Sequence, residues 1–147
     1  MGKVEEGSKE IRIQIPARLD HVVLVGLALR GICSATTLSD IETYEIEAAV
    51  AEAVNNTVKH AYQCIPDREL EIRIALSQGA ITIQVRDRGK SMKKWKACGL
   101  DFDVHDRLNL PESGMGLTII QSSMDEVNYE TIEGVNVLTM KKCFRAK

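Results

Sequence analysis

Hydrophobic and polar residues follow two different periods along this chain. Alternation with a period of two occurs over residues 11–15, 70–76, 81–85, 126–132 and 135–142, and it predicts strands with one buried face. Helical spacing over residues 39–61 and 114–124, together with an apolar run over 19–31, predicts helices. Pro16 stops the first strand, and Pro66 prevents the second helix from extending further.

Cap and turn residues divide these segments at the expected places. Ser39 and Glu42 form the Ser-x-x-Glu pattern of a capping box, which predicts that a helix begins there. Turn residues at 77–79 and 133–134 each join two alternating segments, so we predict two hairpins. One-sided strands and amphipathic helices together predict an α/β (α+β) two-layer sandwich, in which helices cover one face of a mixed, mainly antiparallel sheet.

Periodicity disappears between residues 88 and 113. A loop of about 25 residues inside a compact domain is usually either functional or disordered, and we predict that this one is a lid. The chain has 147 residues, the size of one domain that buries a real core, and we expect a single domain over 1–147 with a flexible tail at 1–9.

Composition and charge restrict the class of partner. The chain has 19 Lys and Arg against 21 Asp and Glu, so its net charge of -2 gives no electrostatic reason to expect nucleic acid or a membrane as the main partner. The widely spaced cysteines at 33, 64, 98 and 143 lack a zinc or redox pattern, which favours free thiols in a reducing cytosol. The polar start and the lack of a long apolar run lead us to expect a cytoplasmic protein.

Three short motifs carry the candidate chemistry. Glu52 and Asn56 are four residues apart on the predicted helix, so a carboxylate and an amide share one face of that helix. The triplet 87–89, Asp-Arg-Gly, ends a predicted strand, and the segment 113–117, Ser-Gly-Met-Gly-Leu, opens a predicted helix. A Glu/Asn pair facing two glycine turns indicates a magnesium-nucleotide site with a base beside it.

These three motifs, in this order and followed by Met-Asp-Glu-Val at 124–127, resemble the anti-sigma-factor serine kinases of the Bergerat-fold (GHKL) ATPase superfamily. The resemblance extends over residues 11–142. It implies the Bergerat ATPase fold, which is histidine-kinase-like, and it implies that ATP and Mg²⁺ are the cofactors.

The resemblance gives each residue of the predicted helix a role. Asn56 would coordinate Mg²⁺ through its carbonyl oxygen. Glu52 would be the catalytic general base that takes the proton from a serine hydroxyl, a role worth a factor of ~10²–10⁴. Lys59 would reach a phosphate, and His60 has the family's position without an assigned role. The alternatives are an amide bonded within the helix, a solvated carboxylate, an exposed lysine and a packed histidine.

The glycine motifs would bind the nucleotide itself. By resemblance, Asp87 binds the amino group of adenine, and Gly89 lets the backbone approach the ring. An ordinary Asp-Gly turn is the alternative. The second motif would form the far hinge of the lid at 88–113 and present backbone N–H groups to phosphate at a helix start; it consists of Ser113, Gly114, Met115, Gly116 and Leu117. Ser113 would alternatively serve only as a helix cap.

The chain departs from the family's pattern at a few positions. Glu112 stands where some relatives have an arginine for the terminal phosphate, so Arg107 or another cation would replace it, and we expect slower phosphoryl transfer. Ser91 stands where many relatives have a second glycine. Val135 and then Asn136 follow the last glycine, where relatives often have a threonine that assists adenine recognition.

The resemblance implies a cytoplasmic, homodimeric protein-serine kinase that also acts as an anti-sigma factor. It would sequester a sigma factor and phosphorylate a serine of a STAS-type anti-anti-sigma protein, without binding nucleic acid directly. One alternative is a non-catalytic, ATP-gated protein-binding module, which would not need a base at Glu52. Another is the catalytic domain of a sensor histidine kinase, which we expect to require a dimerising helix pair that these 147 residues lack.

Overall fold

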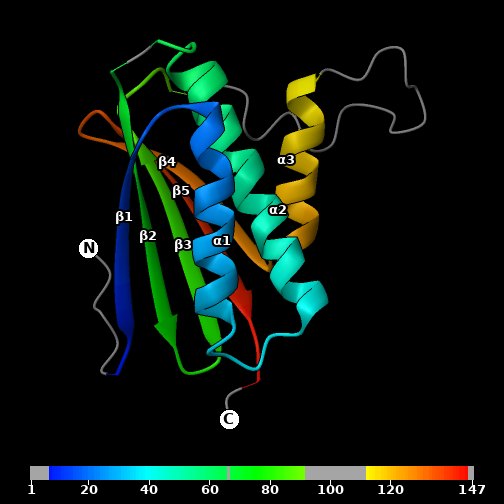
Figure 1. Ribbon diagram of the computed structural model, residues 1–147. Coiled ribbons are helices and arrows are strands. Elements are labelled where there is room, and N and C mark those ends of the chain that lie inside the picture. Colours follow the sequence, from blue (N-terminus) through cyan, green and yellow to red (C-terminus); the bar gives the residue numbers. More distant parts are fainter. Residues whose placement is uncertain (1–6, 66, 92–111, 146–147) are drawn as a thin grey trace.

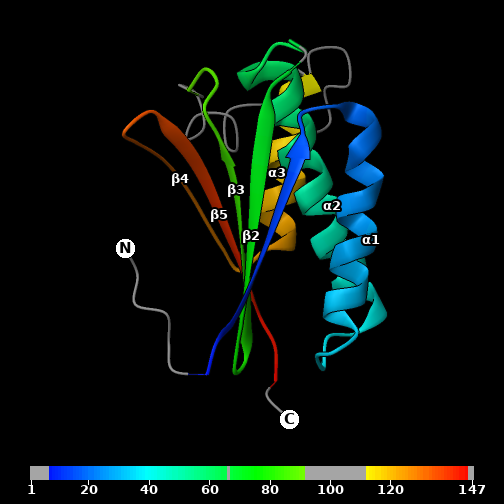
Figure 2. The same ribbon diagram turned by 60° about the vertical axis from the view of Figure 1, so that its left-hand side comes forward.

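The computed structural model describes residues 7–65, 67–91 and 112–145, and for residues 112–117 only their place in a helix. In this part of the chain, a single five-stranded sheet carries all three α-helices on one face (Figures 1 and 2). The predicted two-layer α/β architecture is therefore confirmed. In spatial order the strands are β1 (Lys9–Pro16), β2 (Glu69–Ser77), β3 (Ala80–Asp87), β5 (Val135–Cys143) and β4 (Glu126–Ile132).

We predicted a mixed, mainly antiparallel sheet, and all four ladders between the described strands are antiparallel. The reason lies in the connections. Two helices, α1 and α2, join β1 to β2, so the chain reverses direction three times and β2 returns antiparallel to β1 (Figure 1). In the same way, α3 and β4 lie between β3 and β5.

The alternating pattern determines which side of the sheet is buried. Ile72 and Ile74 of β2 pair with Val85 and Ile83 of β3, and all four are at most 1% exposed under the helix layer. Charged residues take the intervening positions, such as Glu71 opposite Arg86 on the other face. β1 begins at Lys9, so the last residue of the predicted tail belongs to the sheet, and residues 1–6 lie outside the described part.

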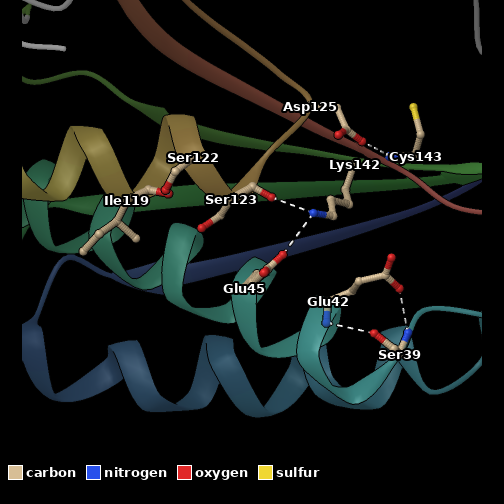
Figure 3. A network of polar contacts seen from close by, with 9 residues as sticks. All are labelled: Ser39, Glu42, Glu45, Ile119, Ser122, Ser123, Asp125, Lys142 and Cys143. Atoms are coloured by element: carbon tan, nitrogen blue, oxygen red, sulfur yellow. Dashed lines mark hydrogen bonds and ion pairs between the residues drawn. The ribbon is translucent and has the colours of Figure 1, made fainter. Parts of the chain in front are cut away.

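The helices begin and end close to their predicted positions. A short 3₁₀ turn, η1 (Leu19–His21), precedes α1 (Val22–Cys33). The second helix, α2 (Asp40–Asn56), begins at the predicted capping box. The Ser39 hydroxyl accepts from the backbone N–H of Glu42 at 3.1 Å, and the Glu42 carboxylate accepts from the N–H of Ser39 at 2.8 Å (Figure 3).

The predicted helix 39–61 does not continue with α-helical geometry to its end. After Asn56 the backbone widens into a π-helical turn, η2 (Thr57–Ala61), in which the N–H of Tyr62 donates to the Thr57 carbonyl at 2.9 Å. π-Helical turns occur mostly as single turns and are frequent at functional sites. This turn reaches the end of β3, where Lys90 donates its N–H to the carbonyl of Ala61 at 2.8 Å.

α3 (Glu112–Ser123) is fixed at its C-terminal end. Lys142 of β5 donates to the Ser123 carbonyl at 2.8 Å and to the Glu45 carboxylate of α2 at 3.1 Å (Figure 3). The helix begins two residues before its predicted start, so the last two residues of the predicted lid are helical. Because α3 runs antiparallel to α2, its first residues lie at the same end of the helix layer as η2 (Figure 1).

The remaining structural predictions concern cysteines and membranes. Cys33, Cys64 and Cys143 are free thiols, as predicted, whereas Cys98 and residues 92–111 of the predicted lid lie outside the described part. Among the described helices, none combines the length and the apolar character needed to cross a membrane.

Candidate functional site

A cavity of about 340 Å³ lies between the end of the α2–η2 helix and the sheet. Four of the predicted site residues line it, namely Asn56, Lys59, His60 and Asp87. Its volume falls in the range of roughly 300–1,000 Å³ that is typical of ligand pockets. Ala53, Val85 and Leu138 contribute apolar walls, so the cavity combines apolar surface with a small number of polar groups.

Asp87 is the buried anion of this cavity, with only 7% of its surface exposed. Its Oδ1 accepts two hydrogen bonds, from the backbone N–H of Gly89 at 2.8 Å and from Nδ2 of Asn136 at 2.8 Å. Within the described residues no hydrogen bond is recorded on its Oδ2. Burial raises the pKa of Asp87, and the hydrogen bonds from Asn136 and Gly89 oppose that rise. One carboxylate oxygen is thus held by the protein, and the other is left for a ligand.

Asn136 was not among the predicted site residues. It is 2% exposed and lies directly opposite Asp87 in the ladder between β3 and β5. A polar residue at a position of β5 that shares a face with buried Leu138 and Met140 is the signal that could have identified it. Lys90 is a second cavity residue that the motifs did not indicate.

Gly89 is required by close packing against the π-helical turn. A Cβ at this position would lie 2.4 Å from the carbonyl oxygen of Ala61 and 2.9 Å from Cδ1 of Tyr62. The prediction was that Gly89 lets the backbone approach a base. The close approach seen in the structure is to η2, and it positions the turn after β3 against the helix that carries Asn56.

Asn56 is the last residue of α2 and is only 8% exposed. In the described part of the chain its side-chain amide has no recorded hydrogen-bond partner, although it lines the cavity. The amide atoms of Asn56 are not enclosed without a partner, so they open onto the cavity and are accessible to a ligand. A carbonyl oxygen is a hard donor of the kind that Mg²⁺ prefers, so this residue fits the predicted metal.

Glu52 lies one helical turn before Asn56 on α2 and is partly buried. It is not among the described residues that line the cavity. Asn56 therefore lines the cavity and Glu52 does not, although the two residues are one turn apart on the same helix, as we predicted.

The exposed side of the cavity carries two lysines and a histidine. Lys59 and His60 stand exposed on the π-helical turn, and Lys90 stands exposed just after β3. A lysine side chain contacts an anion as a mobile point charge. This arrangement therefore suits phosphate groups that extend out of the buried part of the cavity. The described cavity thus has a buried carboxylate at one side, an amide on its wall and cations near its mouth.

The second glycine motif occupies the start of α3. Ser113, Gly114, Met115, Gly116 and Leu117 form its first residues, and the side chains of this segment lie outside the described part of the structure. Glu112 is the first residue of the same helix, and Arg107 lies outside the described residues.

Comparison with known proteins provides independent information on the family of this chain. Residues 15–142 match the family described as histidine kinase-like ATPase domain. The chain is 32% identical over 134 residues to the serine-protein kinase RsbW of Bacillus licheniformis, covering 89% of this chain and 84% of that protein. It is 31% identical over 135 residues to the serine-protein kinase RsbW of Listeria monocytogenes serovar 1/2a, covering 90% of this chain and 86% of that protein.

A solved structure supports the fold. The crystal structure of the RsbU and RsbW domains of Rv1364c from Mycobacterium tuberculosis matches with a TM-score of 0.65 at 18% sequence identity. The match covers 94% of this chain and 32% of that longer chain, and at this identity it is evidence for the fold alone.

Proposed function

Because this chain belongs to the histidine kinase-like ATPase family, together with the RsbW serine-protein kinases, we propose that it is an ATP-dependent serine kinase and anti-sigma factor. The chain transfers a phosphoryl group to a serine of a STAS-type anti-anti-sigma protein and sequesters a sigma factor. It works as a cytoplasmic homodimer. The observation that carries this proposal is that Asn56 and Asp87, which come from separate motifs, line one cavity.

The buried end of the cavity supports adenine binding. A carboxylate oxygen without a protein donor accepts a hydrogen bond from the 6-amino group of the base, while Val85 and Leu138 contact the faces and edges of the ring. An adenine bound in this way would exchange water for apolar contact and give the second carboxylate oxygen of Asp87 a donor. Losing such a buried partner typically costs ~1–3 kcal/mol, which makes Asp87 the main residue for base selection.

The polar side of the cavity supports binding of the phosphates with their metal. Asn56 would hold Mg²⁺ through its carbonyl oxygen, and the metal supplies positive charge that neutralises the phosphate oxygens. Lys59 and Lys90 contact the phosphates as mobile cations, and His60 lies beside them. Only the first backbone N–H groups of α3 lack an intrahelical acceptor, so within the second glycine motif Ser113 and Gly114 would present theirs to a phosphate.

Glu52 is the proposed general base for the transfer. The Glu52 carboxylate takes the proton of the substrate serine as the serine oxygen forms a bond to the γ-phosphorus and the bond to the bridging oxygen of ADP breaks. The products are phosphoserine and ADP. Glu52 is partly exposed and does not line the cavity, so the acceptor serine would reach it from solvent.

A variant of the proposed base separates transfer from binding. Glu52→Ala should keep its affinity for Mg-ATP and lose phosphoryl transfer by a factor on the order of 10² or more, if the base supplies its usual share. Transfer is measured with γ-labelled ATP and the STAS-type proteins of the same organism, and binding is measured by calorimetry. Glu47→Ala is the matched control, because Glu47 lies on the same helix in an ion pair with Arg30 at 2.7 Å.

A second candidate is favoured by the position of Glu52 outside the cavity wall and by Glu112 in place of an arginine. It is a non-catalytic protein-binding module whose surface is controlled by ATP. If the unaltered protein binds Mg-ATP and captures a sigma factor but labels no STAS-type protein, the kinase assignment is wrong and this second function replaces it. If the protein does not bind ATP, both functions are wrong.

A further inference from the structure

A directed chain of hydrogen bonds reaches Asp87 from the last hairpin. Asn136 of β5 donates one side-chain hydrogen to Oδ1 of Asp87 at 2.8 Å and the other to the carbonyl of Gly89 at 3.0 Å. Its Oδ1 accepts from the hydroxyl of Thr131 on β4 at 2.8 Å. The hydroxyls of Thr131 and Ser91 are 3.0 Å apart, and since Thr131 gives its hydrogen to Asn136, Ser91 is the donor between them.

These hydrogen bonds are consistent with only one orientation of the Asn136 side-chain amide. If the Asn136 amide were rotated by half a turn, its oxygen would face the Asp87 carboxylate and its nitrogen would face the Thr131 hydroxyl. Two acceptors would then meet at 2.8 Å in a buried position, where an unpaired acceptor is costly. Thr131 therefore fixes the amide, and the amide fixes which oxygen of Asp87 the protein occupies.

We propose that Asn136, oriented by Thr131, is the positioning residue that keeps Asp87 directed at the 6-amino group of a purine and so makes the cavity select ATP over ITP. This inference rests on the proposed nucleotide-binding function. The neighbouring residue Val135 has no polar side-chain group. The side-chain hydrogen bond from this hairpin to Asp87 is therefore donated by Asn136. Asn136 acts through Asp87, whose free oxygen makes the contact with the base.

The chemistry of the two bases makes the proposal specific. Adenine presents an amino group at position 6, whereas hypoxanthine, the base of ITP, presents a carbonyl oxygen there. An ionised carboxylate accepts a hydrogen bond from the amino group and repels the carbonyl oxygen. Without Asn136 the Asp87 carboxyl loses one of its two recorded donors, so it rotates more freely and is protonated more readily. A protonated carboxyl donates to a carbonyl as well as it accepts from an amino group.

The test compares the affinities of Mg-ATP and Mg-ITP by calorimetry in the unaltered protein, Asn136→Ala and Thr131→Val. We expect Asn136→Ala to weaken ATP binding about tenfold and ITP binding much less, so that the preference for ATP falls by about tenfold. Thr131→Val keeps the side-chain shape on an exposed hairpin and removes only the hydroxyl, so it should reduce the same preference by a smaller factor.

Val137→Ala is the matched control. Val137 is the next residue of β5 and is 3% exposed, but its side chain points to the opposite face of the sheet. This variant loosens the same strand and should leave the ratio of the two affinities unchanged.

The possible outcomes separate the proposals. If Asn136→Ala or Thr131→Val lost both nucleotides in parallel, or kept the original preference in a folded protein, Asn136 would have a structural role only and the inference would be wrong. If the unaltered protein bound neither nucleotide, the proposed function would be wrong, and this inference with it.

Discussion

The substitution Gly89→Ala tests the contact that joins the end of β3 to the π-helical turn. The new Cβ would lie 2.4 Å from the carbonyl oxygen of Ala61 and 2.6 Å from its carbonyl carbon. Both are backbone atoms, so no side-chain rotation relieves the overlap. The turn after β3 has to move away from η2, and the hydrogen bond from Lys90 to Ala61, now 2.8 Å long, has to lengthen or break.

The magnitude follows from three opposing contributions. Forcing an extra methyl group into packed structure typically costs ~1–3 kcal/mol. Losing one backbone hydrogen bond costs ~0.5–1.5 kcal/mol. The lower entropy of alanine in the unfolded chain returns ~0.4–1 kcal/mol. The free energy of unfolding should therefore fall by about 2 kcal/mol, which lowers the melting temperature of a domain of this size by about 4–8 °C.

Thermal unfolding followed by circular dichroism measures this change, and Gly26→Ala provides the control. A Cβ at Gly26, inside α1, would meet nothing within 4 Å, so this variant should gain ~0.5–1 kcal/mol from helix propensity. The same chemical change should thus have opposite signs at the two positions. A Gly89→Ala protein as stable as the parent would refute the packing argument.

The remaining predictions concern a helix cap, a hairpin turn, the proposed magnesium ligand and the charge of Asp87. Ser39→Ala should lower the free energy of unfolding by ~1 kcal/mol and leave ATP affinity unchanged, as measured by denaturant titration and calorimetry. Glu133→Asn should raise the free energy of unfolding by about 0.5–1 kcal/mol in the same denaturant titration. Glu133 has a φ of 50° and precedes a glycine, in a hairpin turn that favours Asn-Gly. Asn56→Ala should weaken Mg-ATP binding roughly tenfold, or by about 1.4 kcal/mol, and leave ATP binding without magnesium almost unchanged in calorimetry. Asp87→Asn should weaken ATP binding by roughly tenfold to a hundredfold yet stabilise the protein at pH 8. This gain in stability should shrink as the pH falls, because burial raises the pKa of Asp87 and the parent then loses the same charge.

The strands could be predicted from the sequence because their signal is local. The limits of β4, residues 126–132, follow directly from alternating residues and the Glu133–Gly134 turn. The start of α2 likewise follows from two residues, Ser39 and Glu42, whose side chains bond to the adjacent backbone. The antiparallel ladder of β3 with β5 has no local signal, because α3 and β4 separate the two strands in the sequence.

The π-helical turn could not be predicted from periodicity. Apolar residues such as Val54, Val58 and Ala61 fit an α-helical spacing, and one wider turn at the end of a helix hardly changes that pattern. The change is set by tertiary contacts at the end of the helix. Ala61 accepts from Lys90, and Tyr62 accepts from the N–H of Arg88 at 2.9 Å while donating to the Glu69 carbonyl at 2.7 Å.

The site could be predicted in part. Asn56 and Asp87 were identified from motifs, and both line the same cavity. Asn136 was missed because its role depends on pairing with a residue 49 positions away. The packing of Gly89 on Ala61 was missed for a similar reason, since Ala61 comes from a distant helix end, and the predicted approach of Gly89 to a base stays a prediction. The role predicted for Glu52 concerns a protein substrate, so it stays a prediction.

The residues around this cavity break several rules that the rest of the domain follows. Asp87 is a buried carboxylate with a raised pKa, and Asn56 is a buried amide with no recorded partner in the described part of the chain. Just after η2, Gln63 and Cys64 adopt positive φ values of 51° and 56°, a conformation that disfavours residues other than glycine. A buried carboxylate and strained backbone cost stability, and a ligand that binds Asp87 and Asn56 in the folded protein only would offset part of that cost. ATP should therefore stabilise this domain most strongly at the end where α2, η2 and β3 meet.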